Sequence, residues 1–152
     1  MAIARGAGTE IIRTASFERA GGTGTQKLII GEQYHIYTVL SVVIYSDVIG
    51  AGGRLQLWLQ AFDGYTGDSA QAINIFQQER PELYGTFVWN DKFSFAGTEP
   101  NWSGHSGQMT TAAEQDEIAD QDTSTSQSLI FESSNDNNFF DITITYIDQN
   151  NS

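Results

Sequence analysis

Hydrophobic and polar residues alternate with a period of two along several stretches of the chain, the pattern of strands with one buried face. The clearest alternation spans Phe139–Ile147, where Phe and Ile alternate with Asp and Thr. In Leu55–Phe62 the residues Leu55, Leu57, Leu59 and Ala61 share one face, and in Thr86–Phe95 aromatic residues alternate in the same way. Asp91 interrupts the apolar side of the last stretch, which predicts a bulge or a change of register there.

Tyr34–Ser46 (YHIYTVLSVVIYS) is apolar on both faces and rich in β-branched residues. It predicts a long central strand that is buried on both sides. Shorter strands are expected over Glu10–Ser16, Ile73–Gln77 and Ser128–Ser133.

Seven or eight strands with at most one short helix predict an all-β protein, an antiparallel β-sandwich with jelly-roll-like connections. An immunoglobulin-like sandwich is the alternative. The one helix is expected after Thr111, because Thr111-Ala-Ala-Glu114 has the spacing of a capping box. Residues 1–9 (MAIARGAGT) hold too little apolar mass to fold, so we expect a flexible N-terminal arm and one sandwich domain over 10–152.

The amino-acid composition excludes several kinds of functional site. The chain has 152 residues, no Cys and two His, which excludes disulfides and thiolate metal sites and leaves no basis for a metal or a cofactor. No apolar run is long enough to cross a bilayer, and the first residues lack the apolar core of a signal peptide. We therefore expect no membrane partner and no export signal.

Charge is unevenly distributed. The net charge is −12, which argues against nucleic acid as a partner because phosphate binding needs a basic surface. Residues 93–152 hold ten acidic residues and no Lys or Arg, whereas residues 1–27 carry a net charge of +2. Most of this charge is expected to be solvated surface. Arg5, Arg13 and Arg19 are the candidate partner-binding residues, able to pair with carboxylates on an acidic neighbour.

Motifs for catalysis are weak. Gly104-His105-Ser106-Gly107 lacks the second glycine of a nucleophile elbow and lies in a Gly/Ser loop. The acidic run from Glu114 to Asp122 lacks the spacing of a calcium loop, and Asp63–Asp68 fits a turn better than a metal site. Trp102, in a loop-like context, is the candidate residue for contact with a ligand such as a glycan.

Four stretches together resemble small virion structural proteins of marine tailed bacteriophages, including cyanophages. They are MAIARGAGTEIIR, GEQYHIYTVLSVVIYSD, GTFVWNDKFSFAGTEP and FFDITITYIDQNNS. The resemblance covers most of the chain and includes no catalytic motif. It implies a β-sandwich located in the virion, such as a capsid decoration protein or another particle-surface protein, with other virion proteins such as the major capsid protein as partners.

The preferred hypothesis is therefore a non-enzymatic virion structural protein that acts as an oligomer. The two apolar faces of Tyr34–Ser46 favour oligomerisation, because one sandwich core can cover only one of them. A trimer is expected from the way jelly-roll particle proteins commonly assemble. A carbohydrate-binding module or adhesin is the alternative, and an enzyme with carboxylates of perturbed pKa is the third possibility.

Overall fold

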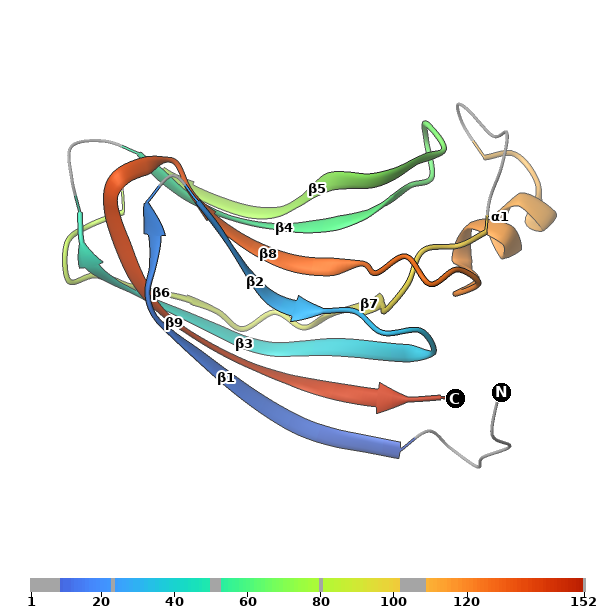
Figure 1. Cartoon of the computed structure of the whole chain (residues 1–152), viewed down its shortest axis with the longest axis horizontal. Coiled ribbons are helices and arrows are strands. Elements are labelled where there is room, and N and C mark those ends of the chain that lie inside the picture. The colour runs from blue at the N-terminus through green and yellow to red at the C-terminus, as the bar shows by residue number, and fades with distance from the viewer. Residues whose placement is uncertain (1–8, 23, 50–52, 80, 102–108, 152) are drawn as a thin grey trace.

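Two antiparallel sheets pack face to face in the computed structural model, which describes residues 9–22, 24–49, 53–79, 81–101 and 109–151 (Figure 1). In chain order the elements are β1 (Thr9–Gly22), β2 (Thr25–Ile30), β3 (His35–Val48), β4 (Arg54–Asp63), β5 (Asp68–Glu79), β6 (Thr86–Trp89), β7 (Phe93–Ala96), α1 (Ala112–Ala119), β8 (Ser128–Ser133) and β9 (Asn135–Asn150). The first sheet has the order β1-β9-β3-β6, with β7 also paired to β3, and the second has the order β2-β8-β4-β5.

The pairing is nested, as in a jelly roll. β1 pairs with β9, β2 with β8, β3 with β6 and β7, and β4 with β5, so the chain folds like one long hairpin rolled into two sheets. The pairs β3–β9 and β4–β8 complete the two sheets. The predicted all-β, jelly-roll-like sandwich is thus confirmed.

The core lies between the sheets and comes from the alternating strands. Leu55 and Leu57 of β4 and Phe140, Ile142 and Ile144 of β9 are all fully buried, as their alternation predicts. Phe131 of β8 packs edge-on against Phe140 and so joins the two sheets, with ring centroids 5.4 Å apart. At the β5–β6 edge, Phe76 contacts Phe87 and Trp89, which closes that side of the core.

β3 corrects one prediction about faces. Leu40 is an extra residue relative to β9, since Val39 pairs with Tyr146 and Ser41 pairs with Thr145. The bulge reverses the alternation, so Tyr37 and Val39 before it and Val42 and Ile44 after it all point into the core. A strict period of two, which would place Val39 and Val42 on opposite faces, is wrong here. The outer face of β3 is half-buried rather than buried.

The stretch Thr86–Phe95 forms two strands instead of one. β6 ends at Trp89 and β7 begins at Phe93, and their registers on β3 differ by one residue. The change falls between Trp89 and Phe93, in the segment that contains Asp91, where a bulge or a change of register was predicted. β2 has no counterpart among the predicted strands, and β1 begins at Thr9 and continues to Gly22, well beyond the predicted Ser16.

The predicted helix is confirmed with its cap. The Glu114 backbone N–H donates to Thr111 Oγ1, and the Glu114 carboxylate accepts from the Thr111 backbone N–H. The stretch Asp63–Asp68 is a turn, as predicted, in which Asp63 accepts from the Tyr65 N–H and the Thr66 hydroxyl. These hydrogen bonds lower the pKa of Asp63.

Candidate functional site

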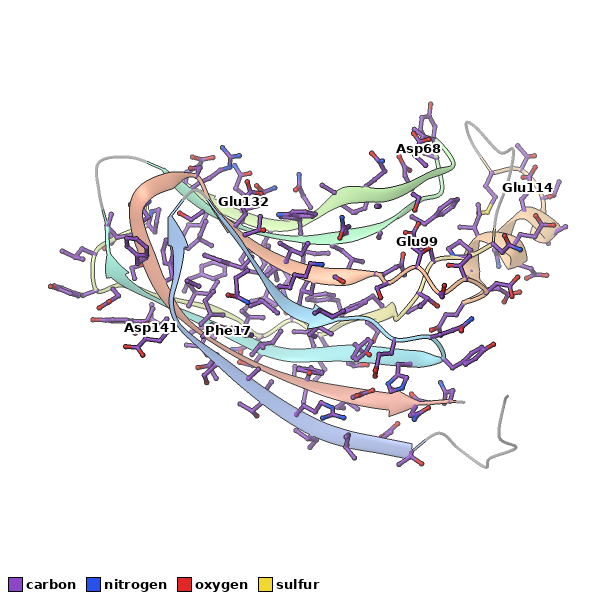
Figure 2. The ribbon with its side chains drawn as sticks, in the orientation of Figure 1. Phe17, Asp68, Glu99, Glu114, Glu132 and Asp141 are labelled. Carbon is purple, nitrogen blue, oxygen red and sulfur yellow. The ribbon has the colours of Figure 1, made fainter. Side chains whose placement is uncertain are left out.

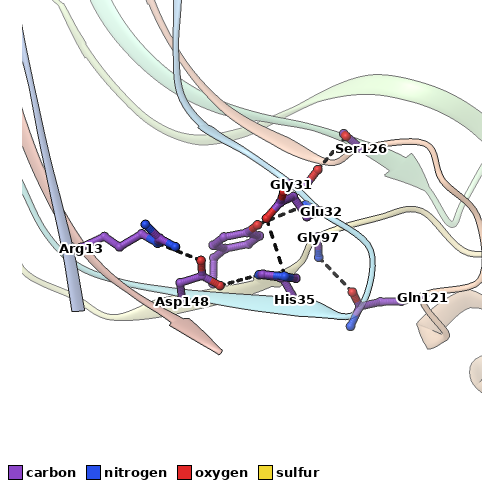
Figure 3. A network of polar contacts seen from close by, with 9 residues as sticks. Arg13, Gly31, Glu32, His35, Gly97, Gln121, Ser126 and Asp148 are labelled. Carbon is purple, nitrogen blue, oxygen red and sulfur yellow. Dashed lines mark hydrogen bonds and ion pairs between the residues drawn. The ribbon is translucent and has the colours of Figure 1, made fainter. Parts of the chain in front are cut away.

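A polar cluster lies on the first sheet, near the start of β3 and the end of β9 (Figure 3). Arg13 of β1, His35 of β3 and Asp148 of β9 are cross-strand neighbours on the inner face of the first sheet. Arg13 Nε donates to Asp148 Oδ2 at 2.9 Å, and His35 Nδ1 lies 2.6 Å from Asp148 Oδ1. The Asp148 side chain is only 5% exposed, so these two partners stabilise a buried carboxylate.

Tyr37 connects this cluster to the apolar core. Its ring stacks on Phe95 at 5.3 Å and lies 5.9 Å from the His35 ring. Its hydroxyl accepts a hydrogen bond from the Glu32 backbone N–H. Burial raises the pKa of Tyr37 to about 12, and the hydrogen bond to Asp148 raises the pKa of Arg13. The shift of Tyr37 reflects its burial, whereas that of Arg13, which is half exposed, reflects its carboxylate partner.

Gly31 and Gly97 allow the loops next to the cluster to approach each other closely. A β-carbon on Gly31 would overlap the carbonyl oxygens of Gly97 and Gln127, and one on Gly97 would overlap the carbonyl oxygen of Glu32. The Gly97 N–H donates to the His35 carbonyl and to Gln121 Oε1. Side chains at either glycine would therefore displace the backbone that carries His35 and Glu32.

This cluster has the composition of a structural network. The His–Asp pair resembles the orienting half of a catalytic triad, but His35 Nε2 faces a carboxylate, Glu32 Oε2, at 3.6 Å. A triad would place a nucleophilic hydroxyl or thiol there. Among the described residues, no group of three His, Asp or Glu side chains is arranged to hold a metal. His35 is thus the hydrogen-bonded, part-buried residue expected of a strand histidine.

The structure has a small hollow at the β5–β6 edge. It has a volume of about 200 Å³ and is lined by Gln78, Glu82 and Phe87 among others. Sites for drug-sized ligands usually measure about 300–1,000 Å³. The hollow therefore gives little support to a small-molecule site.

The predicted site residues do not come together in the described structure. Arg13 is exposed at its guanidinium but pairs with Asp148 of its own chain. Arg5, Trp102 and the side chain of Arg19 lie outside the described residues. Their proposed roles in binding remain predictions.

A second feature is the outer face of the first sheet, which has an uncharged centre. Three successive rows across β1, β9 and β3, the two outer ones continued onto β7 or β6, hold only Ile, Val, Ser and Thr at their paired positions. We call these positions the neutral face: Ile12, Thr14, Ser16, Thr38, Ser41, Val43, Val88, Ser94, Thr143, Thr145 and Ile147. Glu10 and Asp141 bound it at its two ends.

The neutral face is accessible and its hydroxyls are partly paired. None of its side chains is buried; Ile12 is 71% exposed and Val88 48%. Thr38 Oγ1 lies 2.8 Å from Ser94 Oγ, and Ser16 Oγ lies 3.1 Å from Thr143 Oγ1. Because these hydroxyls hydrogen-bond to each other, covering them costs less than covering hydroxyls that depend on water.

Acidic side chains gather away from the neutral face. Figure 2 shows Asp68, Glu99 and Glu114 at the end of the molecule that carries α1. Glu99 is 2% exposed and accepts from the Ser69 hydroxyl and the Ala70 N–H, so it anchors the β4–β5 hairpin. The neutral face is therefore a local exception on a strongly acidic protein. The alternation of Thr with Ile in β9 was the sequence signal for it, but the neighbouring strands could not be identified without the register.

No protein-family model matches the chain, and no curated protein matches it. Among solved structures, the chain is similar to a subunit of the Bacillus endospore appendages, described as a novel family of disulfide-linked pili. The two are 9% identical with a TM-score of 0.45, over 100% of this chain and 97% of the other. This likeness is too low to support an inference about function. No helix in the described ranges is long and apolar enough to span a membrane.

Proposed function

We propose that this protein is a non-enzymatic structural component of a tailed-bacteriophage virion. It is a capsid decoration protein or another particle-surface protein, and it acts as an oligomer. The observation that carries this proposal is the neutral face, an uncharged and exposed sheet surface on a chain with a net charge of −12.

Docking through the neutral face follows from its chemistry. A protein partner that covers Ile12, Val88 and the half-buried Val43 gains apolar burial at about 25 cal/mol per Å². Such a partner removes no charged group from water at the neutral face. The centres of protein–protein interfaces are typically depleted of charged residues. The acidic remainder of the surface keeps the protein soluble and disfavours off-target contacts.

The polar cluster supports the non-enzymatic part of the proposal. His35 is held between Asp148 and Glu32, an arrangement that stabilises the first sheet and offers no nucleophile. A sheet stiffened in this way suits a protein whose role is to present a surface of fixed shape.

The test is to measure the chain in purified particles of the phage that encodes it, by mass spectrometry, and to locate it there by electron microscopy. Thr145→Arg places a bulky charge at the centre of the neutral face and should reduce incorporation at least tenfold. Ala72→Arg, on the exposed outer face of β5 in the other sheet, is the matched control and should leave incorporation unchanged.

Two results would overturn the proposal. One is absence of the chain from purified particles when infected cells contain it in quantity. The other is equal incorporation of Thr145→Arg and wild type, which would remove the neutral face as the contact. Binding of the isolated protein to glycans, with no presence in particles, would favour the carbohydrate-binding alternative.

A further inference from the structure

β1 leaves a long edge of the first sheet open. It pairs with β9 on one side only, and no described strand pairs with its other side (Figure 1). Residues 9–14 are exposed on both faces of the sheet; Ile11, on the inner face, is 44% exposed and Ile12, on the outer face, 71%. An open strand edge of this kind is a template for pairing with another strand.

The first half of β1 has little of the usual protection of an edge strand. Its register on β9 is regular from Thr9 to Phe17, and the irregularities lie further along, at Phe17–Ala20 and Gly21–Gly22. Its inward-pointing charge, Arg13, is paired with Asp148. The strand is 14 residues long and contains neither Pro nor Lys. The β6 and β7 strands, at the opposite edge, have only four residues each, and β2 has six. Natural proteins shorten, charge or bend the edges they leave free. β1 therefore has the length and composition of a strand that is covered.

The net charge of β1 indicates which kind of partner covers this edge. β1 carries Glu10 and Glu18 against Arg13 and Arg19, which gives it no net charge. The other long edge, β5, carries Asp68 and Glu79 with no basic residue. Two copies of a chain with a net charge of −12 repel each other over most of their surface. Contact between two copies costs the least electrostatic free energy where both surfaces are neutral. Among the described strands, β1 is the one long edge strand with no net charge.

We propose that β1 pairs antiparallel with β1 of a second copy, with Ile12 opposite Ile12 at a two-fold axis perpendicular to the sheet. The two first sheets then form one continuous sheet whose outer side joins two neutral faces. In this register Glu10 lies opposite Thr14 and Ile11 opposite Arg13. A register with the two-fold axis at Arg13 would instead place Arg13 opposite itself, and like charges directly opposite are destabilising.

The contact is isologous, so it closes as a dimer. This differs from the three-fold assembly expected from the sequence. The inference concerns the free protein and deepens only the oligomeric part of the proposed function.

The experiment uses the full chain in solution, because it then gives an answer whether or not the protein enters particles. Sedimentation velocity at micromolar concentration should show a dimer for wild type. Ile12→Lys should raise the dissociation constant roughly tenfold or more, since it places two ammonium groups opposite each other. Ile30→Lys is the control, because Ile30 is 59% exposed but lies on β2 of the other sheet. It should dimerise like wild type.

Cysteine cross-linking tests the register in a chain with no other Cys. Ile12→Cys should oxidise to a covalent dimer, because residues directly opposite in antiparallel strands bring their β-carbons to about 4.5–5.5 Å. Ile30→Cys should dimerise without forming a covalent cross-link under the same conditions. A wild-type monomer or trimer, an Ile12→Lys variant that dimerises normally, or equal cross-linking of both cysteine variants would each overturn the proposal.

Discussion

Asp148 illustrates how a single buried charge organises this protein. Its carboxylate is taken out of water at the end of β9, and its partners come from β1 and β3 on either side. Arg13 is 135 residues away in the sequence. A candidate for binding a neighbour is therefore engaged in its own sheet, and its loss would affect stability before it affected any partner.

Arg13→Ala should lower the free energy of unfolding, because it removes one of two partners from a buried carboxylate. Chemical denaturation measures this change. Lys92→Ala is the control, since it removes one positive charge at an exposed position, and it should change stability by less than about 0.5 kcal/mol. Equal effects of the two substitutions would mean that the Arg13–Asp148 pair contributes nothing.

Tyr37 makes stability depend on alkaline pH. Its pKa in the folded protein is about 12, above its ordinary value of 10.0, so the folded state holds the phenol proton more tightly than the unfolded state. The stability that this provides is complete below about pH 10 and is lost as the pH rises to about 12. Tyr37→Phe should therefore lose less stability than wild type over this interval.

Denaturation at about pH 9 and about pH 12 gives the comparison, and phenolate absorbance in the near ultraviolet shows the ionisation directly. Burial also raises the pKa of Tyr146, but that residue is present in both proteins and cancels in the difference. Identical pH dependence of wild type and Tyr37→Phe would contradict the assignment.

Strands with strict alternation were predictable from the sequence, and strands with bulges were predictable only in part. In β4 and β9 the period of two predicts the core positions. Leu55, Leu57, Phe140, Ile142 and Ile144 are fully buried, and Leu59, on the same face, is partly buried against them. In β3 the extra residue Leu40 exchanges the two faces, and no local pattern marks it because residues on both sides are apolar. β2 was missed because it is short and lies next to a glycine-rich stretch.

The polar cluster could not be predicted for a different reason. Arg13, His35 and Asp148 are brought together by pairing between the first, third and last strands, which is a property of the jelly-roll connections. Local periodicity contains no information on such distant partners. The capping box of α1, in contrast, depends on four consecutive residues and was predicted in full.

The helix α1 should open independently of the sheets, because none of its residues is buried. Thr111→Ala removes the cap and should cost about 1 kcal/mol locally, which raises amide hydrogen exchange in α1 about fivefold. Exchange in β4 and β9 should not change. Glu117→Gln, at an exposed helical position, is the control. Equal acceleration in the helix and in β9 would show that α1 unfolds with the core.

In the molecule as a whole, the first and last strands lie side by side and pair antiparallel. Thr9 at the start of β1 pairs with Asn150 at the end of β9, so the sandwich closes only when both ends of the sequence are present. Pairing between such distant segments makes folding slow, typically milliseconds to seconds in β-sandwiches. Within the described residues, this pairing starts at Thr9.

This boundary predicts opposite effects of two truncations. Removal of residues 1–8 should leave the free energy of unfolding unchanged within about 0.5 kcal/mol, because all of the described pairing of β1 is kept. Removal of residues 1–14 should destabilise the protein strongly, since it takes away the first six of the 14 residues of β1 and the Arg13 partner of Asp148. Chemical denaturation of the three chains measures both effects.

The shorter truncation also tests the proposed role of the N-terminal arm. If Arg5 pairs with carboxylates on the particle, removal of residues 1–8 and Arg5→Ala should both reduce incorporation, and added salt should reduce it in wild type. Each exposed pair contributes only about 0–1 kcal/mol, so the effect depends on several copies acting together. Arg5→Ala is more informative here than Arg13→Ala, which also breaks the pair with Asp148. Unchanged incorporation of both variants at every salt concentration would leave the neutral face as the attachment surface without help from the arm.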